Sequence, residues 1–75
     1  MKYEMIREIF NQCSGNRMRD VFVSSVDTED PETYVKEFLK GRDYFCDRKL
    51  MNDGTIIFDV TASGIHQRFS FTEDD

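Results

Sequence analysis

The chain has 75 residues and a formal net charge of −5 at pH 7; its length allows one small domain, and its charge opposes non-specific binding to nucleic acid or to an anionic membrane. Hydrophobic residues make up 39% of the sequence, which is enough for a core and excludes disorder of the whole chain. The two cysteines lack a C-x2-C spacing and no signal-like apolar run follows Met1, so we expect a cytoplasmic protein with reduced thiols, no metal and no cofactor.

The first predicted element is a helix from Tyr3 to Gln12. Apolar residues recur along it at helical spacing, namely Ile6, Ile9, Phe10 and Cys13. Gly15 is placed to end that helix. The segment from Met18 to Val26 is rich in Val and Phe and therefore predicts a strand.

A second helix is predicted to begin at Asp30. The stretch Asp30-Pro31-Glu32-Thr33 supplies an N-cap acid, a proline at the first helical position and a further acid near the positive end of the helix dipole. The buried stripe would be formed by Tyr34, Val35, Phe38 and Leu39. Lys40 and Gly41 are residues typical of a helix end.

Three strands are predicted in the remaining sequence, over Tyr44–Met51, Thr55–Ala62 and Ile65–Thr72. Turn residues separate them, Asn52-Asp53-Gly54 first and Ser63-Gly64 second. The domain is expected to cover residues 1–72 and to be followed by an acidic tail at 73–75.

The two turns set the register of these strands. A two-residue Ser63-Gly64 loop places Phe58 opposite Phe69 and Ile56 opposite Phe71. A three-residue Asn52-Asp53-Gly54 loop places Leu50 opposite Ile56 and Cys46 opposite Val60. A two-residue Asp-Gly loop would instead set Lys49 and Asp47 against the core, and burying those charges is costly. We therefore predict the three-residue loop.

One apolar sheet face and two amphipathic helices predict an α+β fold. Its architecture would be a two-layer sandwich in the order α-β-α-β-β-β, with two helices on one face of a four-stranded, mostly antiparallel sheet. The link from the first strand to the second is long enough for a right-handed parallel crossover. The position of the first strand in the sheet is left open.

The stretch CSGNRMRD, residues 13–20, has a cysteine with an arginine six positions later. It resembles the phosphate-binding loop of protein tyrosine phosphatases, above all the low-molecular-weight branch, in which glycine and asparagine follow the cysteine. The resemblance implies Cys13 as the thiolate nucleophile and Arg19 as the phosphate clamp, with Asp30 as a general acid. The predicted anion-binding residues are Cys13, Ser14, Gly15, Asn16, Arg17 and Arg19.

A second interpretation of this stretch requires no chemistry. In the phosphatase family the cysteine follows a strand and the loop leads into a helix, whereas here a helix is predicted before it and a strand after it. Asp20 also replaces the usual hydroxyl residue and would repel phosphate. On this interpretation Cys13 packs at a helix end and the following residues turn the chain.

The predicted register gathers a second set of residues on the sheet face opposite the core: Phe45, Asp47, Ile57, Asp59, His66 and Arg68. The carboxylates, the histidine and the arginine would form an acid/base site if a pocket desolvated them. On an open sheet they would form solvated ion pairs of small energetic value. Phe45 and Ile57, with charges around them, also suit the centre of a protein interface.

The sequence favours a small non-catalytic binding or interaction module that self-associates through its sheet or an edge strand. The expected partner is another protein or a second copy of the chain, as in a homodimer. The alternative function is the anion site at Cys13–Arg19, which at its strongest would be a cysteine-dependent phosphatase.

Overall fold

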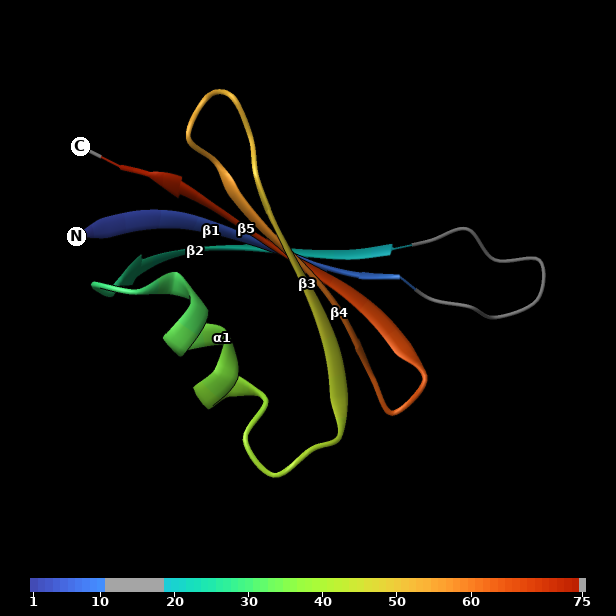
Figure 1. Ribbon diagram of the computed structural model, residues 1–75. Helices are drawn as coiled ribbons and strands as arrows, with labels where there is room; N and C mark the ends of the chain where they lie inside the picture. The colour runs from blue at the N-terminus through green and yellow to red at the C-terminus, as the bar shows by residue number, and fades with distance from the viewer. Residues whose placement is uncertain (11–18, 75) are drawn as a thin grey trace.

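Five strands and one helix make up the described part of the chain. The computed structural model describes residues 1–10 and 19–74. In chain order the elements are β1 (Lys2–Phe10), β2 (Arg19–Asp27), α1 (Pro31–Phe38), β3 (Tyr44–Leu50), β4 (Ile56–Ala62) and β5 (Ile65–Glu73). The strands form one sheet in the order β2-β1-β5-β4-β3, and every neighbouring pair is antiparallel. Figure 1 shows α1 on one side of a strongly twisted sheet.

The predicted sandwich of two helices on a four-stranded sheet is wrong. The segment predicted as a helix from Tyr3 forms β1, which lies between β2 and β5. Within the described residues the sheet therefore has five strands, and the element order is β-β-α-β-β-β. The chain ends lie side by side (Figure 1), because Asp74 N donates to the carbonyl oxygen of Lys2 at 2.8 Å.

The side chains of β1 explain why its period was misread. Tyr3 and Met5 are buried on the side of the sheet that α1 covers, as a strand pattern requires. Arg7 occupies the next position on that side, where an apolar residue would have revealed the alternation. Ile6 and Phe10 lie on the opposite side, so apolar residues occur on both faces. The remaining apolar residues then match helical spacing by coincidence.

The strand predicted over Met18–Val26 is present as β2, with Met18 outside the described residues. Because every neighbouring pair is antiparallel, β2 and β3 run in the same direction. They are the two edge strands of the described sheet, so α1 lies in the connection between its opposite edges. The crossover considered from the sequence therefore does not join adjacent strands.

Both predicted hairpin registers are confirmed. Phe58 lies opposite Phe69, and Leu50 lies opposite Ile56. Ser63 and Gly64 have φ values of 52° and 77°, and positive φ at both turn residues is the geometry of a type I′ hairpin. Gly54 has φ 91°, as the predicted left-handed position requires.

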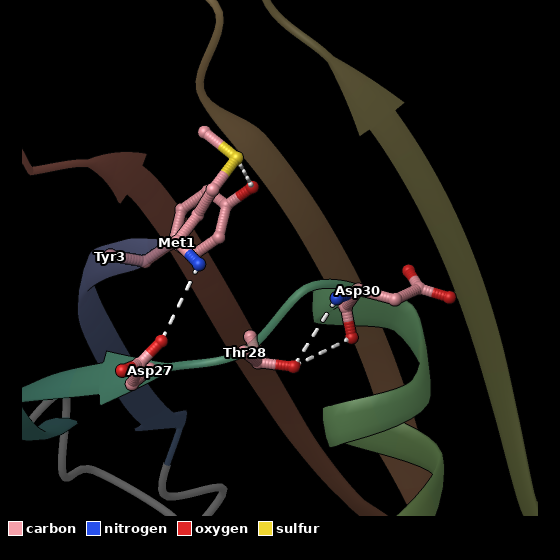
Figure 2. A network of polar contacts seen from close by, with 5 residues as sticks. All are labelled: Met1, Tyr3, Asp27, Thr28 and Asp30. Atoms are coloured by element: carbon pink, nitrogen blue, oxygen red, sulfur yellow. Dashed lines mark hydrogen bonds and ion pairs between the residues drawn. The ribbon is translucent and has the colours of Figure 1, made fainter.

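The predicted start of the second helix is also confirmed. Asp30 Oδ1 accepts a hydrogen bond from Glu32 N at 3.1 Å, and its Oδ2 accepts one from the hydroxyl of Thr33 at 2.8 Å. Figure 2 shows how the chain reaches this point: Thr28 Oγ1 lies within hydrogen-bonding distance of the Asp30 backbone. The Met1 nitrogen lies 3.4 Å from Asp27 Oδ1 at the end of β2.

The core lies between α1 and one face of the sheet. Its largest fully buried side chains are Phe58, Phe69, Phe71, Leu39, Val35 and Val60. Edge-to-face ring contacts order the aromatic residues, for example between Phe58 and Phe71 with centroids 5.8 Å apart. A helix of 8 residues spans only about 12 Å, whereas a strand of 9 residues spans about 30 Å. The outer parts of the sheet therefore extend beyond the helix.

Candidate functional site: the open sheet face and the β2 edge

The sheet face opposite α1, which we call the open face, carries a charge network centred on Asp59. Asp59 Oδ1 accepts a hydrogen bond from Arg68 Nε at 3.0 Å and lies 3.3 Å from His66 Nε2. Its other carboxylate oxygen lies 4.0 Å from Lys49 Nζ. These side chains come from β3, β4 and β5, so the network links three neighbouring strands.

The surroundings of Asp59 keep its carboxylate ionised. Partial burial by itself would raise its pKa, but hydrogen bonds and charge from Arg68 and His66 outweigh that effect, so the pKa of Asp59 is lowered. A general acid at neutral pH needs a raised carboxyl pKa. This arrangement therefore suits a fixed negative charge in an ion-pair network.

Phe10 completes the network and was missed by the sequence interpretation. Its ring stacks on the His66 ring with centroids 4.7 Å apart, and Arg68 Cζ lies 5.4 Å from the Phe10 ring centroid. The helical spacing of the sequence predicts Phe10 on a helix. Only the pairing of β1 with β5, which sets it opposite His66, places it on the open face.

The structure brings the six predicted open-face residues to the same side of the sheet. Asp47 is paired with Asp59, and Asp59 is paired with Arg68, as predicted. Phe45, on the edge strand β3, is 83% exposed, whereas Ile57 on the neighbouring strand β4 is half-buried. Within residues 1–10 and 19–74 we find neither an enclosed cavity nor a group of three or more His, Cys, Asp and Glu side chains able to hold a metal ion.

The predicted anion-binding loop lies almost wholly outside the described residues. Residues 13–17 belong to the segment between β1 and β2, and of Arg19 only its place at the start of β2 is described. A strand precedes this segment, where a helix had been predicted. A strand also follows it, whereas the phosphatase loop leads into a helix.

The second cysteine, Cys46, is a free thiol on β3. Partial burial and the nearby carboxylates of Glu32 and Asp47 raise its pKa. A raised pKa reduces the thiolate fraction at neutral pH, and the thiolate is the reactive form. The raised pKa works against Cys46 as a nucleophile, although its side chain is exposed.

Arg7 forms a cluster on the helix side of the sheet. Its guanidinium donates two hydrogen bonds to Gln67 Oε1, from Nε at 3.1 Å and from Nη2 at 3.0 Å. Gln67 is only 4% exposed. The Arg7 Cζ lies 4.5 Å from the centroid of Phe38 on α1, a cation–π contact. Burial and the nearby charge of Arg42 lower the pKa of Arg7.

The β2 edge presents an apolar surface on both faces of the sheet. Val21, Phe22 and Val23 are 50%, 52% and 63% exposed. Because side chains alternate, the two valines lie on the open face and Phe22 lies on the helix side. The six residues VFVSSV, positions 21–26, carry no charge. Among the described residues only β1 pairs with β2.

The other edge, β3, is built differently. Its centre carries three consecutive charged residues, Asp47, Arg48 and Lys49. Charged side chains, lysine above all, discourage pairing of an edge strand with another chain. Only the β2 edge lacks this protection within the sheet described. The sequence contained the relevant signal, an uncharged run of high β-propensity, but its position at an edge depends on β1.

Comparisons with protein-family models, with curated proteins and with solved structures find no match to this chain. The helix in the described residues is too short and too polar to cross a membrane.

Proposed function

We propose that this protein is a non-catalytic interaction module that self-associates through the β2 edge. The observation that carries the proposal is a nine-residue edge strand whose positions 21–26 carry no charge and which exposes apolar side chains on both faces. A strand of this kind is a template for pairing with another chain, because its outer backbone groups can continue the sheet.

The size of the domain supports the same conclusion. A domain of this length buries a modest share of its surface, and association commonly supplements its stability. Pairing at β2 would remove Val21, Phe22 and Val23 from water and add backbone hydrogen bonds. Pairing at β3 would confront charged side chains instead.

Proline substitutions at the two edges test the proposal, because proline lacks the amide hydrogen that edge pairing uses. Thr28 N donates to the Met1 carbonyl at 3.0 Å, so by antiparallel alternation the N–H of Val23 faces away from β1. Met51 N likewise donates to Thr55 O at 2.8 Å, which makes the N–H of Cys46 face outward from β3. Val23→Pro and Cys46→Pro are therefore matched variants of the two edges.

Sedimentation equilibrium over a range of protein concentrations provides the measurement. We expect the wild-type chain and Cys46→Pro to dimerise, and Val23→Pro to remain monomeric with an unchanged circular dichroism spectrum. A second variant, Val23→Lys, should also be monomeric and guards against a folding defect caused by the proline. A wild-type chain that stays monomeric at every concentration would refute the proposal, as would dimerisation lost in Cys46→Pro but kept in both Val23 variants.

A further inference from the structure

The outward-facing positions of β2 follow from its pairing with β1. Since the hydrogen bond from Thr28 to Met1 marks a hydrogen-bonded pair, alternation assigns positions 20, 22, 24 and 26 to bonds with β1. The N–H and C=O groups of Val21, Val23 and Ser25 consequently point away from the sheet. These are the groups that an added strand would use.

We infer that two copies of this chain pair their β2 strands antiparallel about a two-fold axis at Val23. This inference rests on the proposed self-association and adds its register, symmetry and stoichiometry. A two-fold axis perpendicular to a sheet keeps each side chain on its own face, and residues that lie opposite each other share a face. Opposed residues are therefore an even number of positions apart in sequence, so one residue must lie opposite its own copy. With Val23 at that position, all nine residues of each strand are paired. Moving the axis to Phe22 or Ser24 would leave one end of each strand unpaired.

The side chains agree with this register. Val23, the most exposed apolar residue of β2, is covered by its own copy. Phe22 lies opposite Ser24 of the other copy, so each large ring faces a small side chain. Asp27 pairs with position 19 of the other copy and Asp20 pairs with Val26, so this register sets no aspartate opposite another. A parallel arrangement would oppose each aspartate of the strand to itself.

The same geometry limits the assembly to two copies. The two five-stranded sheets join into one continuous sheet, with both α1 helices on one side and both Asp59 networks on the other. Each outer edge of the joined sheet is then a β3 strand with its charged centre. Further strand addition is discouraged at both ends, so the interface closes as a dimer instead of growing into a fibre.

Single-cysteine variants test the register directly. They are made in a background with Cys13→Ser and Cys46→Ser, and diamide serves as the oxidant that takes two electrons and two protons from each pair of thiols. In Val23→Cys the two Cα atoms would lie about 5.5 Å apart across a hydrogen-bonded pair, within the range of a disulfide. In Val21→Cys the two thiols would be four positions out of register, about 13 Å along the strand.

We expect rapid covalent dimerisation of Val23→Cys and none of Val21→Cys or Ser25→Cys alone. A mixture of Val21→Cys with Ser25→Cys should form the mixed disulfide, detected by mass spectrometry of the nonreduced dimer. Cross-linking in Phe22→Cys or Ser24→Cys in place of Val23→Cys would overturn the register while leaving pairing at β2 intact. No cross-link in any variant of a chain that sediments as a dimer would overturn pairing at β2, and a chain that never dimerises would overturn the proposed function as well.

Discussion

The contact between Arg7 and Gln67 is expected to couple two residues energetically across β1 and β5. Gln67→Leu removes the acceptor of two hydrogen bonds from a half-buried cation. A hydrogen bond to a charged group contributes about 1.5–3 kcal/mol, and water can restore part of it at a half-exposed guanidinium. We therefore expect the free energy of unfolding to fall by about 2 kcal/mol.

The partner substitution is Arg7→Met. It removes the cation–π contact with Phe38, worth about 0.5–1 kcal/mol at a partly exposed site. It also leaves the Gln67 amide, 4% exposed, without its donor, which costs about 1–3 kcal/mol. The double variant Arg7→Met/Gln67→Leu has no stranded polar group, so its loss should be smaller than the sum of the two single losses by at least about 1 kcal/mol.

Urea unfolding measures all four proteins, in the Val23→Pro background so that dissociation does not contribute to the free energy. A domain of this size has about 4–11 kcal/mol of stability by the usual per-residue values, so a loss of about 2 kcal/mol should leave a measurable unfolding transition. Equal m-values show that the unfolded states are comparable. Additive losses, within about 0.3 kcal/mol, would contradict the described hydrogen bonds between Arg7 and Gln67.

Three further predictions concern the ion pairs of Asp59, the Ser63-Gly64 turn and the N-cap of α1. The pKa of Asp59 is lowered in the folded protein, so its contribution to the free energy of unfolding is present above the unfolded carboxyl pKa of about 3.9 and is lost as pH falls through the folded value. The stability advantage of wild type over Asp59→Asn, measured by urea unfolding from pH 7 to pH 3, should therefore shrink on acidification. A constant difference between the two proteins would contradict this prediction. Ser63 has φ 52°, so Ser63→Asn should stabilise the protein by a few tenths of a kcal/mol, because Asn tolerates that conformation better. Gly64→Ala, at φ 77°, should destabilise it by about 1 kcal/mol. Thermal melts compare the two variants, and a stabilised Gly64→Ala would be inconsistent with the turn. Asp30→Ala should lower the free energy of unfolding by about 1 kcal/mol, because it removes the N-cap acceptor. Asp30→Asn keeps that acceptor and serves as the control. An equally large loss in the control would show that the cap hydrogen bond is not the cause.

The parts of the fold that the sequence predicted correctly are local. The two hairpins among β3, β4 and β5 depend on turn residues within a few positions, and Ser63-Gly64 and Asn52-Asp53-Gly54 have the expected backbone conformations. The helix start depends on Asp30 and the three residues after it. Since the open-face residues follow from these local registers, the pairs joining Asp47, Asp59 and Arg68 were also predictable.

The parts that it did not predict depend on contacts between distant segments. Arg7 on the core side of the sheet is held by Gln67, 60 residues away in sequence, which accepts two hydrogen bonds, and by a cation–π contact with Phe38. The sequence does not reveal that contact, so the charged residue at position 7 hides the alternation typical of a strand. Without β1 in the predicted sheet, the edge position of β2 cannot be predicted either. The exposed β2 edge and the position of Phe10 beside His66 could therefore not be predicted from the sequence.

Amide hydrogen exchange measured by NMR at two protein concentrations tests pairing at β2 most directly. At low concentration the outward-facing amides of Val21, Val23 and Ser25 should exchange quickly, and so should the outward-facing amide of Cys46 on β3. At a concentration where the protein is dimeric, we predict protection of the three β2 amides with no change at Cys46. Protection of Cys46 instead, or of none of these amides in a protein that has dimerised, would contradict the proposed edge pairing.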